Sequence, residues 1–163
     1  MSPLEIFKNI SAVNIPERTV PFVICEEDLV SMGIVFAEKI FYERFLGKTE
    51  GPSPDHVLYF GDLLYPAEDK SILLSLGGRE RGGVQLSDIF FLTKSQECEK
   101  KGFLLNGGLA NLFYTSDREG LPFVGGFCST PNGWSLHVDK DNSVKWREGR
   151  RIFSRNISPM FVH

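Results

Sequence analysis

The chain has 163 residues, with 18 basic and 21 acidic side chains and a formal net charge of −3. Apolar residues make up 42% of it, a globular composition that argues against a disordered chain. So small a net charge also argues against a protein that coats polyanions or membranes as a whole, and any basic site must be local.

The three cysteines, Cys25, Cys98 and Cys128, favour reduced thiols. They are odd in number, widely spaced and make no C-x-x-C pair, so they match neither a disulfide framework nor a structural zinc site. No stretch reaches the roughly 18 apolar residues that span a bilayer, and the first residues do not resemble a signal peptide. We therefore expect a cytoplasmic protein that does not bind membranes and needs no metal or other cofactor.

Residues 26–47, EEDLVSMGIVFAEKIFYERFLG, predict one long helix. Three acids at its start suit a helix N-terminus, and Gly47 is a typical C-terminal stop. Helical periodicity spreads the apolar residues over about half of the circumference, more than a surface helix requires. We expect this helix to lie deep against a sheet or to contact a second copy of the chain in a homodimer.

Five short apolar runs follow, and their Phe, Val, Ile and Tyr content predicts β-strands. They span residues 57–65, 71–76, 84–94, 109–116 and 121–129. The chain has no room for a crossover helix between each pair of strands, so the sheet should be mostly antiparallel. The predicted fold class is α+β: one long N-terminal helix on a meander-like, curved sheet, in a single domain with a helix-bearing part (1–47) and a β-rich part (57–157).

Residues 134–146 alternate between apolar and polar side chains, which predicts a β-hairpin with its turn at residues 139–142. Asp and Asn favour such turns because they tolerate unusual backbone angles. A calcium loop is the functional alternative, but it needs a glycine and a bidentate acid where this chain has Val144 and Arg150. We therefore interpret the segment as a plain hairpin.

The C-terminal part carries a local concentration of basic residues beside Trp134 and Trp146; the candidates are Lys145, Arg147, Arg150 and Arg151. A basic strand next to aromatic rings can bind nucleic acid. Stacking requires ring and charge on one surface, whereas the alternation turns Trp146 away from Lys145 and Arg147. A solvated outer face is the interpretation that the pattern favours over nucleic-acid binding.

A glycine-rich segment, LGGRERGG at residues 76–83, is a candidate anion-binding loop. Between Gly77 and Gly83, backbone amides could approach an anion while Arg79 and Arg81 supply positive charge. The segment lacks the Lys and Ser/Thr ending of a phosphate-binding loop. An ordinary hairpin loop is the structural alternative.

Cys128, His137 and Asp139 are the candidate residues for nucleophilic catalysis. A thiol becomes a useful nucleophile when an imidazole or a helix N-terminus lowers its pKa. The structural alternative is that Cys128 is a small buried apolar residue.

Two hypotheses of function follow. The first is a binding module without catalytic chemistry, which recognises a protein partner or a small anionic ligand. The second is a small hydrolase- or transferase-like enzyme, with a site assembled from loops around Cys128, His137 and residues 77–83. A polar pocket with shifted pKa values would favour the enzyme, and an exposed apolar or basic surface would favour the binding module.

Overall fold

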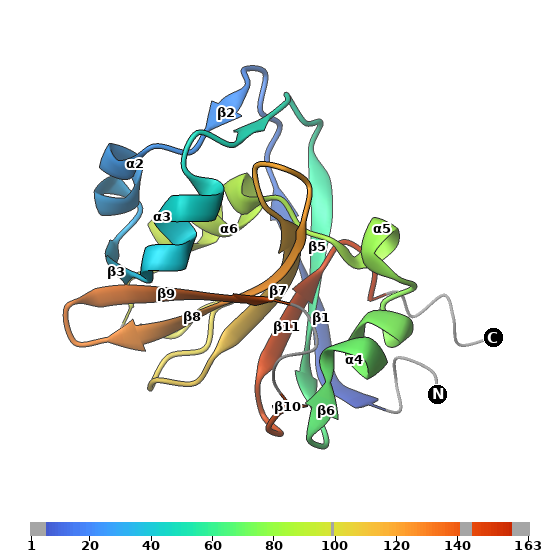
Figure 1. Cartoon of the computed structure of the whole chain (residues 1–163). Helices are drawn as coiled ribbons and strands as arrows, with labels where there is room; N and C mark the ends of the chain where they lie inside the picture. The colour runs from blue at the N-terminus through green and yellow to red at the C-terminus, as the bar shows by residue number, and fades with distance from the viewer. Residues whose placement is uncertain (1–5, 99, 141–144, 158–163) are drawn as a thin grey trace.

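A seven-stranded mixed sheet organises the chain in the computed structural model, which describes residues 6–98, 100–140 and 145–157 (Figure 1). In spatial order its strands are β1 (Phe7–Ile15), β5 (His56–Leu63), β11 (Arg151–Ser154), β7 (Asn111–Ser116), β8 (Pro122–Thr130), β9 (Gly133–Lys140) and β3 (Ile34–Ala37). Neighbours are antiparallel except β11 with β7 and β3 with β9, which are parallel. The sheet is therefore mixed and its strand order is not that of a meander.

Apolar side chains form a separate core cluster on each face of this sheet. The larger cluster is covered by α2 (Glu26–Ser31), α3 (Lys39–Phe45) and α6 (Leu86–Ser95), which lie above β8 and β9 in Figure 1. The smaller cluster includes residues of α4 (Asp69–Ser75), and α5 (Arg79–Gly82) follows that helix. Two short pairs complete the structure: β2 (Phe22–Val23) with β4 (Thr49–Glu50), and β6 (Ala67–Glu68) with β10 (Lys145–Trp146).

The alternation predicted for residues 134–138 is present in β9. Trp134, Leu136 and Val138 are buried in the larger cluster, whereas His137 and Asp139 lie half-buried on the other face. This face assignment follows from the period of two along a strand. It fixes which polar side chains of β9 can meet those of β8.

The long helix predicted for residues 26–47 is wrong. Helix α2 ends before Gly33, whose φ of +80° lies in the left-handed region, and the chain then forms strand β3 before α3 begins. β-Branched Ile34 and Val35 suit a strand, and backbone pairing with β9 outweighs local helix preference. Gly47 does follow α3 with a φ of +83°, as a helix stop should.

The many apolar residues of segment 26–47 are explained by its own fold, without a second copy of the chain. Its side chains point to different places in two helices and a strand, with Phe41 and Phe45 buried and Val30 and Phe36 exposed. The homodimer was inferred from one wide helical face, and that face does not exist. The predicted fold class, a long helix on a meander sheet, is replaced by a mixed sheet with short helices on both faces.

Two of the five predicted strands are helices. Residues 71–76 and 84–94 lie largely in α4 and α6, respectively. The runs at 57–65, 109–116 and 121–129 form β5, β7 and β8 as predicted. Short apolar runs do not distinguish a strand from a helix buried on most sides, and α6 is such a helix.

The hairpin predicted for residues 134–146 is also absent from the described residues. Strand β9 pairs with β8 and β3, and the following strand β10 pairs with β6 instead. The predicted turn falls partly on residues 141–144, which lie outside the described residues.

Strands from both predicted parts of the chain, residues 1–47 and 57–157, join the one sheet. Within the described residues, no helix is both long and apolar enough to cross a membrane.

Candidate functional site

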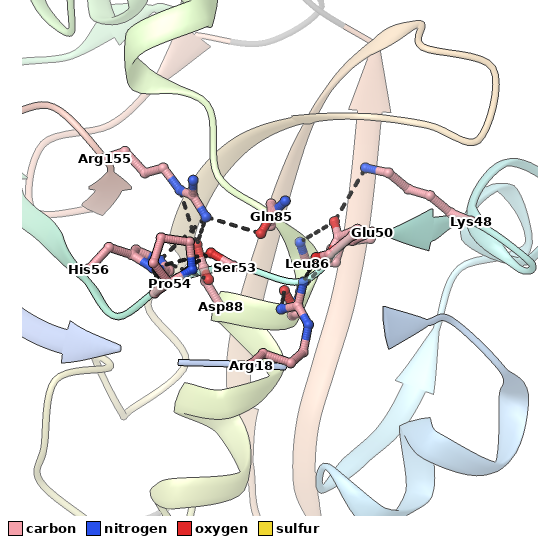
Figure 2. Close-up of polar contacts among 12 residues, drawn as sticks. Arg18, Lys48, Glu50, Ser53, Pro54, His56, Gln85, Leu86, Asp88 and Arg155 are labelled. Atoms are coloured by element: carbon pink, nitrogen blue, oxygen red, sulfur yellow. Dashed lines mark hydrogen bonds and ion pairs between the residues drawn. The ribbon is translucent and has the colours of Figure 1, made fainter. Parts of the chain in front are cut away.

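A buried carboxylate, Asp88, is the centre of a polar network at the start of α6 (Figure 2). Asp88 is 1% exposed and accepts hydrogen bonds from Arg155, with Nη2 at 3.1 Å from Oδ2. His56 Nε2 lies 3.1 Å from the other oxygen, Oδ1. Arg155 also donates to Gln85 Oε1 at 3.0 Å. Segments far apart in the sequence thus supply the partners that a buried charge requires.

The ring of His56 is oriented by a backbone carbonyl. Its Nδ1 lies 2.9 Å from the carbonyl oxygen of Pro54, which only accepts, so the form with a hydrogen on Nδ1 makes this hydrogen bond. The remaining nitrogen, Nε2, lies between Asp88 Oδ1 and Arg155 Nη2, the latter at 3.3 Å. In the neutral ring Nε2 accepts from Arg155, and in the protonated ring it donates to Asp88. His56 can therefore change donor role without leaving the network.

A second buried carboxylate, Glu50, caps the N-terminus of α6. Its two oxygens accept from the backbone N–H groups of Leu86 and Ser87 at 2.8 and 2.9 Å. Those amides have no partner within the helix, and the helix dipole favours negative charge there. Lys48 Nζ lies 3.5 Å from Glu50 Oε2 and donates to the carbonyl of Ser116 at 2.6 Å. β4 thus holds the start of α6 in place.

A cleft of about 620 Å³ opens beside this network, between β4, α5 and the adjoining ends of β7 and β8. We call it the α5–β4 cleft. Its basic side chains are Lys48, Arg79 and Arg155, and its acids are Glu50 and Glu80, which leaves one net positive charge. Arg79 donates to the carbonyl of Thr115 at 3.2 Å, and its guanidinium lies 5.7 Å from the centre of the Tyr114 ring.

The predicted residues Cys128, His137 and Asp139 line a second cavity, on the face of the sheet that carries Leu112 and Tyr114. This β8–β9 cavity measures about 290 Å³ and also touches Glu38 and Trp146. Among the described residues, His137 is hydrogen-bonded to neighbours other than the predicted ones. Its Nδ1 lies 3.1 Å from Glu38 Oε1 and its Nε2 lies 3.2 Å from Ser135 Oγ. The three residues share a cavity, but His137 is held by Glu38 and Ser135.

The electrostatics of the β8–β9 cavity do not favour a thiolate. Burial raises the pKa of Cys128, and Arg150 offsets this only in part. Burial also raises the pKa of Asp139, and the negative charges of Glu38 and Asp69 act in the same direction while His137 opposes them. The cavity thus disfavours negative charge on both groups.

The remaining predicted basic residues are dispersed. Arg151 forms a two-pronged ion pair with Asp62, with Nε at 2.7 Å and Nη2 at 3.1 Å from its oxygens, and lies over the Phe60 ring. Arg150 donates to the carbonyl of Glu148 at 3.3 Å. The other three, Lys145, Arg147 and Arg81, are exposed. The glycine-rich segment is not a hairpin loop, since it forms α5, and it places Arg79 but not Arg81 in the α5–β4 cleft.

Several residues of the Asp88 network carried no recognisable signal in the sequence. No motif singled out His56 or Asp88, and Asp88 lies in the run at residues 84–94 that was predicted to be a strand. One clue existed: an acid flanked by Ser and apolar residues is typical of a helix first turn, which would have made residues 86–95 a helix. The partners of Asp88 come from segments 32 and 67 residues away, which no local pattern indicates.

Comparisons with known proteins found no relationship to report. No protein-family model matches the chain, and neither the curated proteins nor the solved structures include a match. The function therefore has to be argued from the two sites themselves.

Proposed function

We propose that the protein is a binding module that takes up a small anionic molecule, carrying carboxylate or phosphate groups, in the α5–β4 cleft. The observation that carries this proposal is the convergence of Lys48, Arg79 and Arg155 on one cleft of about 620 Å³. These residues come from three distant segments of the chain. The volume falls within the range of about 300–1,000 Å³ that is usual for small-molecule sites.

The lining offers the donors that an anion requires. Arg79 and Arg155 present planar guanidinium groups, which suit carboxylate and phosphate oxygens better than a flexible ammonium does. Both are held in place, Arg79 by Thr115 and Tyr114 and Arg155 by Asp88 and Gln85. The carboxylate of Glu50 accepts hydrogen bonds from two backbone amides of α6. These N–H groups offset part of the negative charge that Glu50 would otherwise present to the cleft.

Calorimetric titration with phosphate, pyrophosphate and citrate tests the proposal. We expect at least one of these anions to bind, and Arg79→Ala to weaken it about tenfold to a hundredfold, because hydrogen bonds to charged groups contribute about 1.5–3 kcal/mol. Arg81→Ala is the matched control, since Arg81 lies on the same helix and outside the cleft lining. Equal losses in the two variants, or no binding by any of the anions, would contradict the proposal.

The alternative is a small enzyme around Cys128 and His137. These two residues do line one cavity, but the thiol of Cys128 is poorly suited to act as a nucleophile. Because burial raises the pKa of Cys128, we expect iodoacetamide at pH 7 to alkylate it more slowly than free glutathione. Mass spectrometry of the labelled peptides measures this rate. Faster labelling of Cys128 than of glutathione would revive the enzyme hypothesis.

A further inference from the structure

The β8–β9 cavity is a defined hollow in the sheet surface. Its floor consists of apolar side chains, Leu112 of β7 and Val124 of β8, together with Gly126. A Cβ atom placed on Gly126 would lie 3.0 Å from Leu112 Cδ2, so a larger residue there would crowd the floor. The helices α2, α3 and α6 lie on the opposite side of β8 and β9 (Figure 1). The side chains of His137 and Glu38, which line the hollow, are 44% and 37% exposed, so the hollow opens to solvent on this face.

One wall of the cavity is a fixed aromatic ring. Trp146 of β10 lines the cavity, and its indole N–H donates to Asp69 Oδ1 at 2.7 Å. Asp69 is fully buried and also accepts from the Tyr114 hydroxyl at 2.7 Å. An indole held in this way presents its ring without further ordering, and Trp is the best aromatic partner for a cation.

The charged groups of the lining are mostly acidic. Glu38 and Asp139 face the cavity together with His137, and the buried Asp69 lies behind Trp146. Burial is the main cause that raises the pKa of Asp139; the negative charges of Glu38 and Asp69 raise it further, and His137 lowers it. One positive charge, that of Arg150, also acts on the cavity, since it partly offsets the rise that burial causes in the pKa of Cys128. A bound positive charge would relieve the repulsion among the carboxylates.

We propose that the β8–β9 cavity binds a small organic cation, an amine whose apolar body rests on Leu112 and Val124 and whose charge is stabilised by Trp146, Glu38 and Asp139. A volume of about 290 Å³ admits about ten non-hydrogen groups, at about 30 Å³ for each water-sized group. A metal ion is a poorer fit, because the described residues contain no cluster of three or more His, Cys, Asp or Glu placed to hold one. Among the described residues, this cavity and the α5–β4 cleft have no lining residue in common.

The proposal is tested by calorimetric titration of the full chain with three ligands of similar size and shape. Benzylamine carries a positive charge, benzyl alcohol is neutral and benzoate is negative. We expect benzylamine to bind at least tenfold more tightly than benzyl alcohol, and benzoate not to bind in the cavity. Equal binding of benzylamine and benzyl alcohol, or no binding of benzylamine, would overturn the proposal.

Variants locate the binding. We expect Asp139→Asn to weaken benzylamine binding at least fivefold, whereas Glu17→Gln, which removes one negative charge from an exposed position outside the cavity, should not. Gly126→Val should also weaken binding by filling the floor, and Asp139→Asn remains informative if that variant does not fold. Unchanged affinity in Asp139→Asn would show that the amine binds elsewhere. Arg79→Ala should leave benzylamine binding intact, which separates this proposal from anion binding in the α5–β4 cleft.

Discussion

Asp88 and Asp139 are two carboxylates beside the same sheet that are stabilised to very different degrees. Asp88 is almost fully buried, and Arg155 and His56 contact its two oxygens. Asp139 is half-buried, its pKa is raised by burial, and Glu38 adds to that effect. The two carboxylates thus differ in the donors around them as well as in their depth. We call Asp88 the saturated carboxylate, because donors contact both of its oxygens, and Asp139 the unsaturated one, because the described part of the chain shows no side-chain hydrogen bond to it. A saturated carboxylate stabilises the fold, and an unsaturated one is available to a ligand.

Removing the saturated carboxylate should have the largest effect. In Asp88→Ala the guanidinium of Arg155 and the ring of His56 lose their shared acceptor while remaining partly buried. Breaking a buried pair in this way costs about 3–5 kcal/mol in the free energy of unfolding. Urea denaturation monitored by circular dichroism measures it. A loss below about 1 kcal/mol would mean that water replaces Asp88 in the network.

The cap on α6 offers a second, smaller test. Glu50→Ala leaves the amides of Leu86 and Ser87 without their acceptor, at a cost of about 2 kcal/mol. Because a helix N-terminus binds anions, acetate should restore part of the melting temperature when compared with chloride at equal ionic strength. Glu80→Ala is the control, since it removes the same charge from an exposed position on α5. Equal effects of acetate on the two variants would contradict a specific cap.

The unsaturated carboxylate should give the smallest effect and the opposite sign. A raised pKa means that folding favours the protonated form of Asp139, so its contribution to stability is present at pH values below the ordinary pKa of 3.8 and is lost as pH rises through the raised value. In Asp139→Asn the side chain cannot ionise, so the loss of stability that ionisation of Asp139 causes in wild type does not occur. We expect the stability of the variant relative to wild type to increase over this pH range in thermal melts, and Glu17→Gln to show no such trend. A relative stability that falls with rising pH would reverse the assignment.

The sequence indicated the strands better than the helices. Period-two alternation placed Trp134, Leu136 and Val138 on a buried face correctly, because a strand shows its environment in every second residue. The composition of a short apolar run failed for α6, where apolar residues surround most of the helix and leave no clear period. Helical periodicity failed at residues 34–37, whose strand exists because β9 is available to pair with it. Local secondary-structure preference predicts poorly where pairing with a distant strand determines the conformation.

The candidate sites divide in the same way. Cys128, His137 and Asp139 could be grouped because neighbouring strands keep nearby residues together. Arg155 and Asp88 could not be paired, since 67 residues separate them and neither belongs to a motif. Arg79 and Arg81 looked equivalent in the sequence. Only the helical geometry of α5 places one in the cleft lining and the other outside it.

The position of β11 in the sheet has a consequence for the order of folding. β11 lies between β5 and β7 but follows all six of its fellow strands in the chain. Until residues 151–154 have been synthesised, β1 with β5 and the group of β7, β8, β9 and β3 are two separate pieces of sheet. Pairing between strands so far apart in the sequence is slow, and the edges of β5 and β7 stay exposed until β11 pairs with them. On the ribosome, the sheet is completed only after this segment has left the exit tunnel, and the next residue, Arg155, then reaches Asp88.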